Sequence, residues 1–195
     1  MFTGIIEAVG RIQQVEQRDG GVRLTIESDR LDFSDVAIGD SIAANGVCLT
    51  VIALAGNAYT VDVSQESLNC TAGLAAPGEV NLEKAMRLSD RLGGHLVSGH
   101  VDGVGEVVKF EPVGDSHLLQ IRPPQALSRY IAPKGSITVN GVSLTVNEVR
   151  DGVFSINLIP HTVEVTTLKH LKPGSRVNLE VDLLARYVDR LLHPL

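Results

Sequence analysis

The chain has 195 residues, of which 44% are hydrophobic, and a formal net charge of -6 at pH 7. An acidic chain whose basic residues are dispersed lacks the clustered positive surface that nucleic acids and anionic membranes bind, so neither partner is expected. Met1 is not followed by a basic and apolar leader, no apolar run is long enough to cross a bilayer, and Cys48 and Cys70 are the two cysteines, so we expect a reduced cytoplasmic protein.

The first residues of the chain recur at a fixed distance. Residues 4–10 read GIIEAVG and residues 99–105 read GHVDGVG, an offset of 95 (99 minus 4). A repeat this long fills nearly the whole chain and indicates a duplicated fold rather than a solenoid. We therefore expect two domains, residues 1–92 and 93–182, with residues 183–195 outside the duplication.

Each half is then predicted to form two short strands joined by a glycine turn. These strands cover residues 10–15, 22–27, 105–110 and 118–122. Residues 29–36 do not alternate, and the spacing of their apolar residues predicts a short helical turn. The counterpart, residues 124–131, follows two prolines that suit the start of a helix.

Both halves carry the same hairpin signal. Residues 45–51 read NGVCLTV and residues 140–146 read NGVSLTV. Asn-Gly accepts the positive φ angles of a type I′ turn, and the residues that follow alternate as in a half-buried strand. The side chains predicted to point away from the core are Cys48, Thr50, Ser143 and Thr145.

The hairpin is part of a predicted three-strand meander, after which a short irregular segment leads to one closing strand. These strands cover residues 38–44, 47–54, 59–63 and 77–83, and residues 136–139, 142–149, 154–159 and 173–180. Six short strands per half favour a closed barrel, because closure removes exposed edges. The predicted fold class is all-β, with two tandem six-stranded antiparallel Greek-key-like barrels.

Two segments lie outside the barrels. Residues 84–92 are charged and suit a linker. Residues 182–193 predict an amphipathic helix that Asp182 can cap, with an apolar stripe of Leu184, Val188, Leu191 and Leu195. The stripe is equally consistent with packing on the helix's own barrel and with a seam for assembly between chains.

The two halves differ at positions that bear chemistry. His100 stands where the first half has Ile5, and Lys134, Ser143, His161 and Asp182 likewise replace Gly39, Cys48, Glu66 and Ala85. A metal site at His95 and His100 is not favoured, because a spacing of five suits neither a helix face nor a strand face. Two similar pockets with different chemistry suit two copies of one ligand in different roles.

Five motifs together resemble the riboflavin synthase alpha chain family over essentially the whole chain. They are residues 1–7, 44–51, 93–103, 140–146 and 158–162. The resemblance implies dismutation of two molecules of 6,7-dimethyl-8-ribityllumazine, without a cofactor, to riboflavin and 5-amino-6-(D-ribitylamino)uracil. It also implies a homotrimer held by the C-terminal helix, with the active site between the N-terminal barrel of one chain and the C-terminal barrel of its neighbour.

The resemblance also implies which residues bind the substrate. A first lumazine site would comprise Gly4, Ile5, Ile6, Cys48, Leu49, Thr50, Asp62, Val63, Ser64, Gln65, Glu66 and Ser67, with Phe2 and Ser41 added to the substrate-binding set. A second site would comprise Gly99, His100, Val101, Lys134, Ser143, Leu144, Thr145, Ile159, Pro160, His161, Thr162, Val163 and Glu164. The expected catalytic residues are His100, Ser143, Cys48, Thr145 and Asp182.

In this set, His100 and Asp182 are expected to transfer protons, and Cys48 and Ser143 to make polar contacts or add transiently at C7. The C7 methyl of a lumazine is acidic because its carbanion delocalises into the ring, so the site needs hydrogen-bonding groups rather than an extreme base. Residues 68–73 depart from the family's threonine-rich pattern.

The alternative reading is a non-catalytic lumazine- or flavin-binding antenna-type protein, which needs one intact ligand site.

Overall fold

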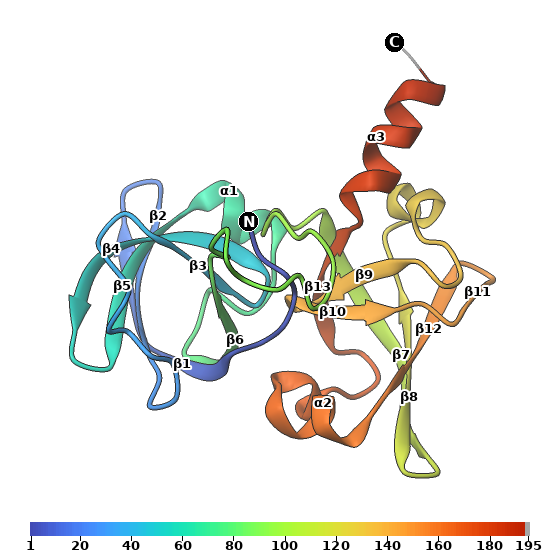
Figure 1. The fold of residues 1–195 in the computed structure, drawn as a ribbon, viewed down its shortest axis with the longest axis horizontal. Coiled ribbons are helices and arrows are strands. Elements are labelled where there is room, and N and C mark those ends of the chain that lie inside the picture. The colour runs from blue at the N-terminus through green and yellow to red at the C-terminus, as the bar shows by residue number, and fades with distance from the viewer. Residues whose placement is uncertain (194–195) are drawn as a thin grey trace.

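The computed structural model describes residues 1–193, so Leu195, the last member of the predicted apolar stripe, lies outside the described residues. Two β-rich units lie side by side, the N-terminus lies between them, and the C-terminal helix projects from the second unit (Figure 1). The all-β prediction is confirmed. Among residues 1–193, no helix is long and apolar enough to span a bilayer.

The first half forms a closed antiparallel barrel with strand order β1-β2-β5-β4-β3-β6. Its strands are β1 (Ala8–Arg18), β2 (Gly21–Glu27), β3 (Ser41–Ala44), β4 (Val47–Ala55), β5 (Ala58–Ser64) and β6 (Gly78–Lys84). Alternate side chains enter the barrel, and Ile12, Leu24 and Tyr59 are fully buried there. The predicted type I′ turn between β3 and β4 is confirmed by φ angles of 47° at Asn45 and 80° at Gly46.

The second half repeats the same cyclic order, but as an open seven-stranded sheet, β10-β9-β13-β7-β8-β12-β11. Its strands are β7 (Gly103–Val113), β8 (Ser116–Arg122), β9 (Ser136–Val139), β10 (Val142–Thr145), β11 (Glu148–Arg150), β12 (Val153–Leu158) and β13 (Arg176–Val181). The predicted strand 142–149 is thus divided into β10 and β11. The interruption lies where the first barrel has a register shift between Val51 and Ala53, so both halves depart from a regular ladder at the same position.

The predictions for the connecting segments were partly wrong. Residues 29–36 form bends and turns instead of a helical turn. Side chains accept several backbone N–H groups in this segment, with Ser28 accepting those of Arg30 and Leu31, and Asp32 accepting that of Ser34. The corresponding second-half prediction is confirmed by the 3₁₀ helix η1 (Gln125–Tyr130). Both segments predicted to be irregular hold helices, too short to show a helical period: α1 (Gln65–Cys70), α2 (Pro160–Val165) and the 3₁₀ helix η2 (Thr167–His170).

The hairpin turns also join the two halves. Gly46 and Gly141 meet back to back, so closely that a Cβ on either would lie 2.8 Å from the backbone nitrogen of the other. Beside them the buried Asn81 side chain donates to Asn140 O at 2.9 Å, and the buried Asn178 side chain donates to Asn45 O at 3.0 Å. The repeated Asn-Gly motif therefore forms both a turn in each half and the contact between halves.

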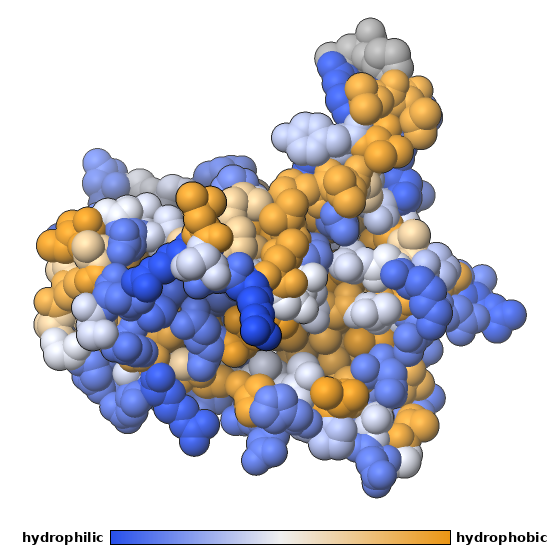
Figure 2. All heavy atoms as spheres, in the orientation of Figure 1, coloured by the Kyte–Doolittle hydropathy of each residue, from blue (hydrophilic) through white to orange (hydrophobic). Residues whose placement is uncertain are grey.

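Helix α3 (Leu183–Leu192) begins at Asp182, whose side chain accepts the Leu184 N–H at 2.9 Å, as predicted. One side of the helix is held to its own half, because Asp189 pairs with Arg129 and accepts the Tyr130 hydroxyl. The apolar side faces solvent, and its exposed side chains are Leu184, Tyr187, Val188, Leu191 and Leu192. Figure 2 shows hydrophobic residues gathered along the projecting helix.

Candidate functional site

Two equivalent positions, named here the first cleft (around Cys48) and the second cleft (around Ser143), each combine residues from both halves. The N-terminal segment crosses to the second half, where Gly4 O accepts the Ser143 N–H at 2.7 Å. The equivalent segment crosses in the opposite direction, where Gly99 O accepts the Cys48 N–H at 2.8 Å. Phe2 and Val97 pair with each other where the two segments pass.

This exchange corrects the predicted grouping of the site residues. Gly4, Ile5 and Ile6 do not lie with Cys48 in the first half. Ile6 packs against the core of the second half, and Val101 packs against the core of the first. The sequence pattern could not indicate this, since the docking groups are backbone carbonyls that every residue carries.

A buried carboxylate anchors each crossing segment to its own half. Glu83 on β6 accepts hydrogen bonds from Thr3 N at 2.6 Å, Thr3 Oγ1 at 2.7 Å and Gly4 N at 3.0 Å. Glu180 on β13 accepts the corresponding hydrogen bonds from Ser98 and Gly99. Burial raises the pKa of both carboxyls above the usual value, although the donors act in the opposite direction.

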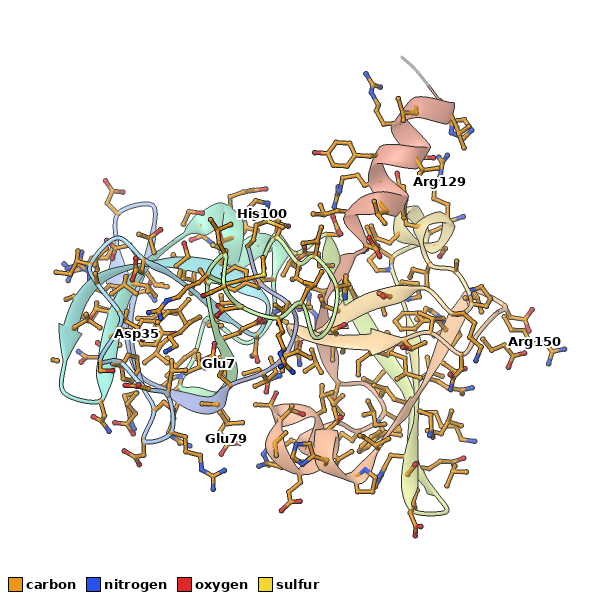
Figure 3. All side chains as sticks on the ribbon, viewed as in Figure 1. Glu7, Asp35, Glu79, His100, Arg129 and Arg150 are labelled. Carbon is orange, nitrogen blue, oxygen red and sulfur yellow. The ribbon has the colours of Figure 1, made fainter. Side chains whose placement is uncertain are left out.

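The first cleft lies at the end of the first barrel, beside α1. It is a cavity of about 210 Å³ lined by Val47, Cys48, Glu66, Ser67, Cys70, Thr71, Gly99, His100 and Val101. The His100 side chain is exposed, next to α1 in Figure 3. Cys70 was not predicted as a site residue, and its thiol donates to Glu66 Oε1 at 3.2 Å, which raises the pKa of that thiol. His100 thus lies with Cys48, not with Ser143.

At the second cleft, the position equivalent to the first in the duplicated fold, the central residue is Ser143 on β10. The Ser143 Oγ lies 2.8 Å from Nδ1 of His95, a buried imidazole that was not predicted to be in the site. Burial lowers the pKa of His95, while the nearby charge of Asp182 acts in the opposite direction. The signal that could have found His95 is its place in the 93–103 motif, five residues before His100. Ile5, which follows Gly4, is half-exposed, and the exposed Thr145 lies two residues after Ser143 on β10.

Several other predicted site residues lie elsewhere. Phe2 is fully buried with Ala43 and Val97, and Leu49 and Leu144 belong to the two cores, so these side chains hold the framework. Asp62 is paired with Arg23 across β5 and β2, and Lys134 has a positive φ of 66° in the loop before β9. The remaining predicted residues, Ser41, Val63, Ser64, Gln65, Ile159, Pro160, His161, Thr162, Val163 and Glu164, lie on β3 and β5, on α1, and on α2 and the residue before it.

The predicted linker borders a further cavity of about 460 Å³ that reaches Thr3 and Ile5. Lys84 and Arg87 are both paired with Asp35, which fixes the linker against the first barrel. Nothing in the sequence pattern predicted this cavity. Within residues 1–193, no group of three or more His, Cys, Asp or Glu side chains is placed to hold a metal ion.

Comparisons with known proteins agree on one family. The model of the lumazine binding domain matches twice, at residues 3–85 and 98–182. The riboflavin synthase of Photobacterium phosphoreum is 50% identical over 98% of this chain and 89% of its own length. The riboflavin synthase of Bacillus subtilis is 42% identical over 99% of this chain and 90% of its own length.

Solved structures give the same fold. LumP in complex with 6,7-dimethyl-8-(1'-D-ribityl) lumazine has a TM-score of 0.82 and 29% identity, covering 93% of this chain and 99% of LumP. LumP in complex with riboflavin has a TM-score of 0.84 and 30% identity over the same shares of the two chains.

Proposed function

This chain belongs to the riboflavin synthase family of lumazine-binding proteins, and from that membership we propose that its two clefts each bind one 6,7-dimethyl-8-ribityllumazine. The activity is that of riboflavin synthase, a transferase: one lumazine gives a four-carbon unit to a second, which yields riboflavin and 5-amino-6-(D-ribitylamino)uracil. The observation that supports the cleft assignment is the paired docking of Gly99 on Cys48 and of Gly4 on Ser143. Two clefts of one design suit two copies of one ligand.

The roles proposed within the clefts follow from the functional group of each side chain. Cys48, Thr50 and His100 would contact the lumazine in the first cleft, and Ser143, Thr145 and Ile5 the lumazine in the second. Hydrogen-bonding groups stabilise the carbanion that forms at the C7 methyl, and holding two rings in register makes a bimolecular step effectively unimolecular. His100 is proposed to transfer protons. Asp182 is proposed to act in the second cleft through its charge near His95.

Incubation of the pure protein with the lumazine alone tests this function. We expect riboflavin to accumulate together with an equal amount of 5-amino-6-(D-ribitylamino)uracil, because donor and acceptor are two molecules of the same compound. The absorbance of riboflavin measures its accumulation, and chromatography of the products measures the ratio of the two. Saturable binding of lumazine with no product would instead favour the binding-protein alternative, although identity is higher to the riboflavin synthases, at 42–50%, than to LumP, at 28–30%.

The proposed assembly is a homotrimer in which the exposed apolar side of α3 packs against its copies. Residues 1–92 and 93–182 would be the two barrel domains and residues 183–195 the assembly segment. Exposed leucines on a helix whose polar side is already held by Arg129 and Tyr130 support this proposal. In a cyclic trimer the first cleft of one subunit would face the second cleft of its neighbour.

Replacing Leu184 and Leu191 by lysine should dissociate this trimer, because charges would then enter an apolar seam. Both side chains are exposed in the single chain, so the barrels should remain folded. Sedimentation should give about three times 20.8 kDa for the wild type and a single chain mass for the variant. Arg190→Ala, at an exposed position of the same helix, is the matched control and should stay trimeric. A trimer in the double variant would place the assembly contacts elsewhere.

A further inference from the structure

The second cleft holds an imidazole contact that the first cleft lacks within residues 1–193. His95 is buried, its Nδ1 lies 2.8 Å from Ser143 Oγ, and its Nε2 has no hydrogen-bond partner in the part of the chain that the structure describes. No hydrogen bond in that part of the chain joins an imidazole to Cys48, the first-half counterpart of Ser143. The two clefts therefore differ in one specific contact.

The surrounding backbone fixes this contact. The His95 N–H donates to Thr3 O at 3.1 Å. A Cβ on the preceding Gly94 would lie 2.1 Å from Thr3 O and 2.8 Å from Ser143 Oγ, so the chain passes directly against the serine. The backbone hydrogen bond to Thr3 and the close approach of Gly94 therefore place the imidazole beside Ser143, with Nδ1 toward the serine hydroxyl.

The environment also indicates which nitrogen of His95 carries the proton. Burial lowers the pKa of His95, which favours the neutral ring, and a neutral imidazole has a single N–H. If that N–H were on Nε2, a buried donor would be left without a partner, whereas on Nδ1 it is satisfied by Ser143 Oγ. Buried donors without partners are rarer in proteins than unsatisfied acceptors.

We propose that His95 is a positioning residue whose Nδ1–H donates to Ser143 Oγ and thereby turns the Ser143 hydroxyl proton toward the bound lumazine. This inference rests on the proposed function. Ser143 then acts as a hydrogen-bond donor to the negative charge that develops on the ring, and not as a nucleophile activated by a base. Cys48, a weak donor without such a contact, makes the first cleft the weaker one for that charge.

Two substitutions of nearly equal size separate a donor from an acceptor at this position. The amide nitrogen of His95→Asn can still donate to Ser143 Oγ, whereas the ionised carboxylate of His95→Asp can only accept from it. We expect His95→Asn to retain kcat within about threefold and His95→Asp to lose about 100-fold or more, as when one donor to a developing charge is removed. KM should change little in either variant, because the contact matters mostly in the transition state.

Nitrogen-15 NMR of the wild-type protein labelled at histidine gives an independent readout. The His95 signal, identified by its loss in His95→Asn, should show a neutral ring protonated at Nδ1, whether or not His95→Asp folds. A neutral ring protonated at Nε2, or a His95→Asp variant more active than His95→Asn, would overturn the proposal. Equal wild-type activity in both variants would also overturn it. If the wild type makes no riboflavin, the proposed function fails, while the NMR result still decides the state of His95.

Discussion

Two inactive variants of this protein should restore activity when they are assembled together. One variant carries Cys48→Ala and His100→Ala in the first cleft, and the other carries Ser143→Ala and Thr145→Ala in the second. In the proposed trimer, each pure variant should be nearly inactive, because every pair of facing clefts would contain one damaged member. After joint unfolding and refolding in equal amounts, about a quarter of the interfaces, one half times one half, should join two intact clefts.

Recovered activity would be measured as riboflavin formation at fixed chain concentration, with mixed trimers verified by native mass spectrometry. Simple mixing without unfolding is the control, and it measures any recovery that occurs without joint refolding. If both lumazines instead react within one chain, every chain keeps a damaged cleft, and the mixed trimers should stay at the background of the separate variants. The grouping of His100 with Cys48 is essential to this design and comes from the structure.

A substitution in the first barrel should disable the cleft of the second half. In Glu83→Gln, an amide nitrogen takes the place of the carboxylate oxygen that accepts the Gly4 N–H. An amide nitrogen is a donor and cannot accept this hydrogen bond, so Gly4 loses its anchor. The loss of one charge-assisted hydrogen bond weakens docking of the segment by about 1.5–3 kcal/mol, or about 10- to 100-fold. Because Gly4 docks on Ser143, this weakening should remove lumazine binding at the second cleft. Each chain should then bind one lumazine instead of two, and the rate of riboflavin formation should fall.

Calorimetric titration with the lumazine counts these sites. The site that remains in Glu83→Gln should disappear when Cys48→Ala and His100→Ala are added, but not when Ser143→Ala is added. Glu180→Gln should give the reciprocal result, because Glu180 holds Gly99 against Cys48. Glu79→Gln changes an exposed position on the strand of Glu83 and is the control. This variant should bind two lumazines per chain. Loss of the Cys48 site in Glu83→Gln would contradict the crossing of the segments.

The sequence by itself determined the parts of this protein that are set locally. Alternating apolar residues specify strands with one buried face, Asn-Gly supplies the positive φ angles of the turns, and spacings of three and four with Asp182 at the start specify α3. The repeated motifs were sufficient to recognise the family. These features depend on periodicity or on the conformational preference of single residues, and both can be read from the order of residues.

Tertiary structure alone decided which groups share a cleft. Gly4 meets Ser143 and Gly99 meets Cys48 through backbone carbonyls, and a carbonyl has no residue type that a sequence could reveal. The contact between His95 and Ser143 likewise joins side chains 48 positions apart in the sequence, which packing brings to 2.8 Å. The duplication explains why two clefts exist. Which cleft each crossing segment joins depends on the buried carboxylates of Glu83 and Glu180, which anchor the segments. Only the folded chain brings these carboxylates to the segments.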